Sequence, residues 1–298
     1  MILFFSLTLL FGFSDSPPTR YPAPARLVAL GDVHGDLDAT RKALRLAGAI
    51  DGNDQWIGGK LVVVQTGDQL DRGDDEQAIL DLFSALTKQA KAAGGAFIPL
   101  NGNHELMNIY ADFRYVTEAG FKDFEAPPGT DLDHHKALPE AQRARAAAFA
   151  PGSPYALLLA QRNIVTIVGE SVFVHGGVLP LHVEYGLEAI NNEMRAWLRG
   201  EALRPPKDKG FEKLVWTRLY SDNPDDEACQ TLSEVLQKLG ARRMIVGHTV
   251  QKDGIQSYCD GQIWCIDVGM AAHYGGKPAV LEISGDQVTP LYETREIP

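Results

Sequence analysis

Five short polar fragments, nearly all of them directly after apolar, β-prone runs, could together hold metal ions. In chain order they are GDVHG at 31–35, GDQLDRG at 67–73, GNHE at 102–105, HGG at 175–177 and GHT at 247–249. Oxygen and imidazole ligands delivered from several strand ends can hold two cations a few ångströms apart, which is the arrangement that activates water against phosphorus. The fragments therefore predict a two-metal phosphoester hydrolase.

The spacing of these fragments assigns the ligands to two ions. Asp32 and His34 are two residues apart, so both can face one cation, and Asp68 has two oxygens to share between both cations. Nitrogen and oxygen ligands of this kind suit Mn, Fe or Zn better than Ca. The side chains expected on the second ion, together with Asp68, are Asn103, His175 and His248.

A second group of residues in the same fragments is suited to proton transfer and phosphate binding. His104 follows Asn103 and is expected to turn away from the metals, toward the leaving-group oxygen, as a proton donor. Asp71 would hold its ring protonated, and Arg72 would clamp the phosphate in a bidentate manner. The alternative for Asp71 and Arg72 is a surface ion pair, and Glu105 is expected to be a structural acid early in a helix.

Apolar patterns on either side of the fragments predict a layered α/β sandwich. Between 108 and 162 the composition changes to alanine, charge and proline-bounded pieces, which indicates a helical insertion. The expected strands are 27–30, 61–65, 97–100, 165–168 and 171–174, with 244–246, 255–258, 263–267 and 279–283 in a second sheet. The expected helices are 36–47, 76–93, 187–198 and 226–239. In open α/β sheets, ligands collect at the carboxyl ends of the strands, where most of the fragments lie.

Composition narrows the class of partner and the redox chemistry. The chain has 298 residues and a formal charge of −11 with no cluster of Lys or Arg, which argues against a nucleic-acid partner. Bound dications would attract a phosphorylated substrate locally. Its cysteines, Cys229, Cys259 and Cys265, are too few for a disulfide scaffold. A hairpin turning at Asp260 would place Cys259 and Cys265 on opposite faces, and three ordinary thiols are expected.

The N-terminal 25 residues are expected to lie outside the catalytic domain at 26–298. Residues 1–13 are apolar but too short to span a bilayer as a conventional helix, so they indicate a signal peptide or a short anchor. Residues 14–25, rich in Pro and Ser, indicate a linker. Export, for example to the periplasm, is the favoured localisation, and a cytoplasmic protein with an apolar tail is the alternative.

The fragments in their wider context resemble the phosphoprotein phosphatase branch of the calcineurin-like metallophosphoesterases, and the Shewanella-like protein phosphatases in particular. The segments that carry this resemblance include QTGD at 65–68, LMN at 106–108, DFRYV at 112–116, VWTR at 215–218 and DVGM at 267–270. The resemblance implies a four-layer αββα sandwich with two mixed sheets. It also implies the metal ligands assigned above, His104 with Asp71 as the acid, and phosphate binding by Arg72 and Arg218, with Arg114 as a further candidate.

The expected reaction is hydrolysis of phosphomonoesters on phosphoproteins, by direct attack of a metal-bridging hydroxide. Both phosphotyrosine and phosphoserine or phosphothreonine remain open as substrates. Val250 stands where many other metallophosphoesterases have a second histidine, which argues against a nuclease or phosphodiesterase. Two alternatives are a dinucleoside polyphosphate hydrolase, which uses the same metal set, and a non-catalytic binding module on the same scaffold.

Overall fold

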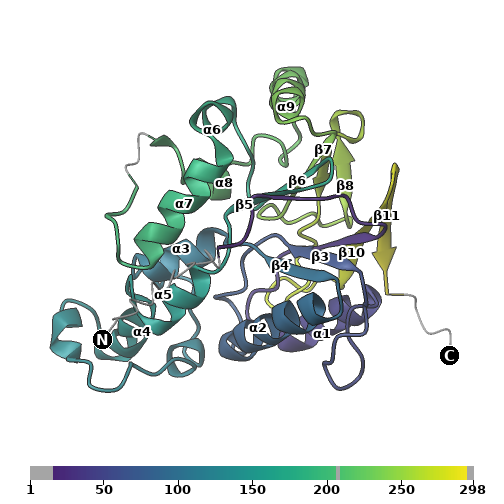
Figure 1. The fold of residues 1–298 in the computed structure, drawn as a ribbon. Helices are drawn as coiled ribbons and strands as arrows, with labels where there is room; N and C mark the ends of the chain where they lie inside the picture. Colours follow the sequence, from purple (N-terminus) through teal and green to yellow (C-terminus); the bar gives the residue numbers. More distant parts are fainter. Residues whose placement is uncertain (1–15, 206–208, 294–298) are drawn as a thin grey trace, which may run out of the picture.

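Two mixed β-sheets lie face to face, and helices cover the outer face of each (Figure 1). The computed structural model describes residues 16–205 and 209–293. Residues 1–13, the expected signal peptide or anchor, lie outside the described residues. The expected αββα sandwich is confirmed, and it provides two sets of parallel strand ends that can meet at one edge.

The first sheet has the strand order β11-β10-β2-β3-β4. Strands β2 (Leu27–Leu30), β3 (Val62–Gln65) and β4 (Ala96–Pro99) are parallel and are joined by α1 (Leu37–Leu46) and α2 (Glu76–Ala92). Asp36 caps α1 by accepting a hydrogen bond from the Ala39 backbone N–H. The three strands are almost completely buried, which fits their continuous apolar runs.

The prediction that 279–283 belongs to the second sheet is wrong. Strand β10 (Ala279–Ser284) pairs antiparallel with β2 in the first sheet, and β11 (Gln287–Tyr292), which was not predicted, pairs with β10 at the edge. An apolar β-rich run shows that a strand will be buried, but it does not show which partner edge will accept it.

The second sheet has the order β1-β5-β6-β7-β9-β8. Strands β6 (Ser171–Val174), β7 (Arg243–Val246) and β9 (Ile263–Cys265) are parallel, whereas β5 (Val165–Val168) and β8 (Gln256–Tyr258) are antiparallel to their neighbours β6 and β9. Two residues of the expected linker, Arg20–Tyr21, form β1 and pair with β5. The linker prediction is therefore wrong at this point.

Alternating side chains on the second sheet serve two hydrophobic cores. Phe173 and Ile245 pack between the sheets with residues of the first sheet. Val172 and Val174 pack on the opposite face, against α7 (Leu187–Leu198) and α9 (Asp226–Leu239). Burying each of these large side chains contributes about 1.5–3 kcal/mol, so the sheets are held rigidly behind the loops at their edge.

Half of residues 103–162 are helical. They contain α3 (Asn103–Ile109), α4 (Glu140–Phe149) and α5 (Pro154–Leu159), with 3₁₀ turns at Gly120–Lys122 and Leu132–His135. Pro154 is the first residue of α5, where its fixed φ suits the first turn, and Pro139 directly precedes α4. Two more short helices, α6 (Pro180–Tyr185) and α8 (Lys213–Trp216), were not predicted.

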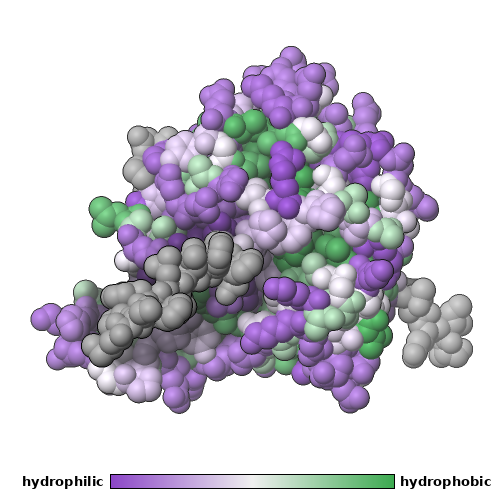
Figure 2. Space-filling view, viewed as in Figure 1, coloured by the Kyte–Doolittle hydropathy of each residue, from purple (hydrophilic) through white to green (hydrophobic). Residues whose placement is uncertain are grey.

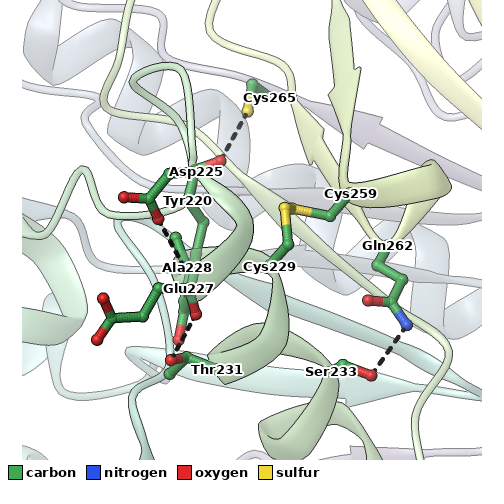
Figure 3. The surroundings of a disulfide bond; sticks show 10 residues. All are labelled: Tyr220, Asp225, Glu227, Ala228, Cys229, Thr231, Ser233, Cys259, Gln262 and Cys265. Atoms are coloured by element: carbon green, nitrogen blue, oxygen red, sulfur yellow. Dashed lines mark hydrogen bonds between the residues drawn. A yellow bond between two sulfur atoms is a disulfide. The ribbon is translucent and has the colours of Figure 1, made fainter.

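A disulfide joins Cys229 of α9 to Cys259, so the expectation of three thiols is wrong (Figure 3). The predicted hairpin does form from β8 and β9, and its turn at Cys259–Gly261 places the half-buried Cys259 beside α9. Cys265 remains a buried thiol and donates to the Tyr220 carbonyl (Figure 3). The pairing depends on the docking of α9 beside the hairpin, and the spacing of the cysteines in the sequence does not reveal it.

The surface in Figure 2 is predominantly hydrophilic, with hydrophobic residues in small patches. Within residues 16–205 and 209–293, none of the helices has the length and apolar character needed to cross a membrane.

Candidate active site

Every predicted metal ligand lies just beyond the carboxyl end of a parallel strand. Asp32 and His34 follow β2, Asp68 follows β3, and Asn103 is the first residue of α3 after β4. His175 and His248 follow β6 and β7 of the second sheet. The two sheets end side by side here, so residues up to 216 positions apart come into contact, as when the His248 backbone N–H donates to Asp32 Oδ2 at 3.0 Å.

The Asp68 carboxylate lies at the centre of this group. Its Oδ2 is 3.1 Å from His175 Nε2 and 3.7 Å from His34 Nε2. His175 Nε2 is also 2.8 Å from Asn103 Oδ1. All four side chains are at most 3% exposed. Asp68 thus lies where its carboxylate could be shared between two ions.

The donor atoms at the centre of the site carry lone pairs that face one another. His34 Nδ1 donates to the Leu70 carbonyl at 3.0 Å, and His175 Nδ1 donates to the Thr66 carbonyl at 3.0 Å. Because a carbonyl can only accept, the proton of each ring lies on Nδ1, which leaves the Nε2 lone pair pointing toward Asp68. These facing lone pairs of His34, His175 and Asp68 repel one another, and a cation bound between them would stabilise the arrangement.

Burial favours the metal-binding forms of these side chains. Desolvation lowers the pKa of His34 to about 3 and that of His248 to about 2, so both imidazoles are neutral, as coordination requires. Among the described residues, Asp32 Oδ1 and His248 Nε2 are buried and have no hydrogen-bond partner. Polar atoms left in this state are costly unless an ion or water pairs with them, and both atoms suit a divalent cation.

Asp267 is a site residue to which sequence analysis gave no role. It follows β9 and is 1% exposed, beside Asp32. Burial raises its pKa to about 6, and burial together with the charge of Asp267 raises the pKa of Asp32 well above its ordinary value. A bound dication would reverse both shifts. The signal was present in the sequence, because Asp267 also ends a predicted strand.

The loops that carry the ligands are strained. Five non-glycine residues of the site have positive φ, a conformation that costs of order 1–3 kcal/mol each and that clusters at functional sites. Glycine provides space beside the carboxylates, because a Cβ on Gly102 would lie 2.3 Å from Asp68 Oδ1 and one on Gly247 would lie 2.2 Å from Asp32 Oδ1. The five strained residues are His34, Asp68, Asp71, Arg72 and His248.

Glu105 holds two of these loops together. Its carboxylate accepts hydrogen bonds from the backbone N–H groups of Gly102, Asp68 and Gln69 at 2.6–2.8 Å. The side chain is fully buried in the first turn of α3. Glu105 is an acid early in a helix, as expected from the sequence. Its hydrogen bonds also hold the backbone of Asp68 in place, a role that was not predicted.

His104 and Asp71 form a buried pair beside the ligands. His104 Nδ1 lies 2.6 Å from Asp71 Oδ2. Burial disfavours the imidazolium, but the negative charges of Asp68 and Asp71 outweigh it and raise the pKa of His104. His104 Nε2 is 3.8 Å from Asp68 Oδ2. The Nε2 edge of the His104 ring therefore faces the same space as the expected metal ligands. The ring lies closer to them than was expected from the sequence, which predicted that it turns away from the metals.

The three arginines proposed for phosphate binding differ in their surroundings. The Arg72 guanidinium lies 4.2 Å from the centre of the Tyr115 ring, and the Arg72 Nε has no hydrogen-bond partner among the described residues. Arg218 Nη1 donates to the His248 carbonyl at 2.7 Å, which places it at the rim of the metal ligands. Arg114 instead forms a bidentate pair with Asp112, and its side chain is 65% exposed. The geometry gives no support to Arg114 as a phosphate ligand.

Comparison with known proteins identifies the family. The profile of the calcineurin-like phosphoesterases matches residues 25–252. The chain belongs to this family. It is 41% identical to Shewanella-like protein phosphatase 2 of Arabidopsis thaliana over 92% of this chain and 81% of that protein. It is 29% identical to Shewanella-like protein phosphatase 1 of Plasmodium berghei, over 84% and 69% of the two chains. The expected Shewanella-like type is confirmed.

Solved structures agree with this assignment. The crystal structure of a cold-active protein tyrosine phosphatase of a psychrophilic Shewanella superposes with a TM-score of 0.76 at 25% identity, over 93% of this chain and 81% of that chain. A protein serine/threonine phosphatase of Saccharomyces cerevisiae shares the fold alone, with a TM-score of 0.62 at 17% identity over 93% and 84% of the two chains.

The dinuclear site that calcineurin-like phosphoesterases share fits the side chains present here. Two buried groups could each hold an ion, and both contain Asp68: one with His34 and His104, the other with His175 and His248. This chain is a metallophosphoesterase hydrolase of the Shewanella-like protein phosphatase type. Distance alone includes His104 in the first group, whereas its pairing with Asp71 also suits a proton donor.

Three aromatic side chains surround the site of this phosphoesterase, each beside a different histidine. The Tyr115 ring is 5.2 Å from His104, the Tyr274 ring is 5.5 Å from His34, and the Trp216 ring is 5.6 Å from His248. They come from three separate segments of the chain. Two of these segments, 112–116 and 215–218, carry the family resemblance, but the role of their aromatic residues could not be predicted, because their approach to the site depends on how the loops pack.

Proposed function

We propose that this phosphatase acts on phosphoproteins and prefers phosphotyrosine. The observation that carries the proposal is the aromatic surround formed by Tyr115, Tyr274 and Trp216. A phosphotyrosine ring can stack on these faces, whereas the side chains of phosphoserine and phosphothreonine offer no ring to contact. A cleft of about 850 Å³ that opens beside His34 and Arg72 leaves room for the peptide that carries the phosphate. The similarity to the Shewanella tyrosine phosphatase also supports this preference.

The side chains around the metal centre supply binding and proton transfer. The buried Nε of Arg72 has no hydrogen-bond partner among the described residues, and Arg72 offers its planar guanidinium to the phosphate oxygens, while Arg218 approaches from the His248 side. His104, held by Asp71, donates a proton to the oxygen that leaves with the substrate. Two divalent ions, when bound, would activate water and neutralise charge on the phosphate.

The donor set also limits which metals this site would take. Asp32 and His34 supply one oxygen and one nitrogen on one side of Asp68, and Asn103, His175 and His248 supply one oxygen and two nitrogens on the other. Mixed imidazole and oxygen ligands favour Mn, Fe or Zn over Ca or Mg. Elemental analysis of protein purified without added metal would identify the ions.

Matched phosphopeptides test the substrate proposal. Peptides that differ only in carrying phosphotyrosine, phosphoserine or phosphothreonine are compared by kcat/KM with the metal-loaded enzyme. We expect the phosphotyrosine peptide to be hydrolysed fastest. Replacing both rings in Tyr115→Leu/Tyr274→Leu should reduce this preference, while the matched Tyr115→Phe/Tyr274→Phe variant, which keeps the rings, should retain it. Equal rates on all three peptides would reject the tyrosine preference.

Two further results would favour the alternatives. Faster cleavage of diadenosine tetraphosphate than of any phosphopeptide would indicate a dinucleoside polyphosphate hydrolase. Absence of hydrolysis by protein that carries two bound metals would indicate a binding module.

We propose that the protein works in an oxidising compartment outside the cytoplasm, such as the periplasm. The Cys229–Cys259 disulfide supports this, because such bonds persist in oxidising compartments and are rare in reducing ones. The apolar residues 1–13 would act as the export signal. Cell fractionation with N-terminal sequencing of the mature protein tests the proposal, and reduced protein recovered only from the cytoplasm would reject it.

A further inference from the structure

Arg145 is a fully buried arginine that is not one of the expected metal ligands. It belongs to α4, in the segment of the chain that connects β4 of the first sheet with β5 of the second, and its side chain is 0% exposed. A buried guanidinium is tolerated only when its charge and its N–H groups are matched. The identity of its partners therefore indicates what it does.

All five N–H groups of Arg145 have acceptors. Nη1 and Nη2 bind the two oxygens of Glu76 at 2.5 and 2.7 Å, in the bidentate geometry that arginine favours. Nε donates to Asn108 Oδ1 at 2.7 Å, and Nη1 also donates to the Gly120 carbonyl at 2.9 Å. The remaining N–H, on Nη2, points to Asp71 Oδ1 at 3.3 Å. The guanidinium thus reaches the partner of His104.

These contacts divide the Asp71 carboxylate between two tasks. Its Oδ1 accepts from Arg145 and from Asn108 Nδ2 at 3.0 Å, which leaves Oδ2 for His104. Glu76 Oε1 accepts the Asp71 backbone N–H at 2.5 Å, so the carboxylate bound by Arg145 also holds the strained backbone of Asp71. Both the position and the rotation of Asp71 therefore depend on the Arg145 network.

We propose that Arg145 is a positioning residue that fixes Asp71, and through it the ring of His104, at the angle needed for proton donation to the leaving group. The proposal rests on the proposed role of His104. It makes the docking of α4 a condition of efficient turnover, because the helical region provides a charge that the dyad uses. Without the Arg145 guanidinium, the buried carboxylates of Asp71 and Glu76 would lose the positive charge that both of them contact, which is unfavourable in a buried site.

The experiment uses aryl phosphates whose leaving groups range from good, such as 4-nitrophenol, to poor, such as phenol. A misplaced acid lowers kcat more for the poor leaving groups, whereas a general loss of structure lowers kcat equally for all. We expect Arg145→Met to reduce kcat for phenyl phosphate by about a hundredfold, at the lower end of general-acid effects, and to reduce it much less for 4-nitrophenyl phosphate. Metal content should be unchanged.

Arg145→Lys keeps a cation and provides a variant that folds if Arg145→Met does not. Lysine cannot reproduce the bidentate contact and the Asp71 contact together, so we expect the same dependence on the leaving group in weaker form. The matched control is Arg195→Lys, a buried arginine of α7 that bonds to Asn163 and Asn192 and not to the dyad. Its effect should be the same for every leaving group.

A double-mutant cycle separates positioning from structure. In the His104→Asn background, the Arg145 substitution should lower kcat for phenyl phosphate by less than about twofold, because the two residues act in one step. Losses that multiply, or that do not depend on the leaving group, would overturn the proposal for Arg145 alone. If His104→Asn itself shows no dependence on the leaving group, the proposed role of His104 fails instead.

Discussion

His104 Nδ1 lies 2.6 Å from Asp71 Oδ2, and both side chains are buried next to the Asp68 carboxylate. One ring nitrogen is thus occupied by a carboxylate that is itself bound by Arg145, while the other nitrogen faces the metal ligands. This division would let two neighbouring residues of α3 take the different tasks that we propose for them, metal binding by Asn103 and proton donation by His104.

Replacing His104 should affect turnover without removing the metals. In His104→Asn we expect kcat on poor leaving groups to fall by about 10²–10⁴-fold, the range for loss of a general acid. The ligand set of six other side chains remains intact, so two ions per chain should still be bound. Kinetics on aryl phosphates combined with elemental analysis checks this, and loss of both ions would show that His104 is a ligand.

Replacing Asp68 should remove metal and activity together. Its Oδ2 lies within 4 Å of His34, His104 and His175, and Asp68 belongs to both groups of side chains that could hold an ion. In Asp68→Asn we expect metal affinity to weaken by more than about a hundredfold, because even outer partners of ligands contribute 10–100-fold. Metal titration with activity measured in parallel tests the coupling. Full activity at substoichiometric metal would contradict the shared role of Asp68.

Thiol titration should reveal the disulfide directly. Burial raises the pKa of Cys265 to about 12, so the native protein should show no reactive thiol. Unfolding without reductant should expose one thiol, and unfolding with reductant should expose three. Three thiols in the absence of reductant would rule the disulfide out.

The disulfide should also stabilise the fold. It closes a loop with a sequence separation of 30 residues, which corresponds to about 3–4 kcal/mol in the chain-entropy treatment. We expect Cys229→Ser and Cys259→Ser to lower the free energy of unfolding by similar amounts, measured with denaturant. The double variant should cost no more than either single variant, because each removes the same bond.

His182 should make the fold sensitive to acid. Its Nδ1 accepts the Leu179 backbone N–H and its Nε2 donates to the Gly210 carbonyl, both at 2.9 Å, so the ring is neutral. Burial lowers the pKa of His182 below 6.5, and the unfolded chain therefore binds this proton more readily. The stabilisation is present above about pH 6.5 and is lost as pH falls toward the pKa of the folded state, by at most about 1.4 kcal/mol per pH unit.

The comparison of wild type with His182→Asn isolates this effect. The difference in unfolding free energy between the two proteins should shrink as pH falls below 6.5, because only the wild type takes up the proton. His134→Asn, at a side chain that is 79% exposed, is the control and should leave the pH dependence unchanged. A constant difference between pH 7.5 and 5.5 would show that His182 does not titrate in this window.

Local pattern was enough to locate most of the sheet and the ligand loops. Apolar runs such as Leu27–Leu30 and Ser171–Val174 are buried strands, and a polar fragment directly after each run must lie at the strand's carboxyl end. The bounds of α7 and α9 also follow from their apolar spacing. These features depend only on residues close together in the chain.

The position of the polar side chains at strand ends could be predicted from the sequence, because strand periodicity and side-chain chemistry are properties of each segment. Three features depend on the packing of the complete chain: β10 joins the first sheet, Cys229 pairs with Cys259, and Arg145 contacts Asp71, 74 positions away. Each of these depends on which edge or face remains free after the other elements have packed. Which edge or face is used depends on the free energy of the whole fold, and it cannot be predicted from any short segment of the chain.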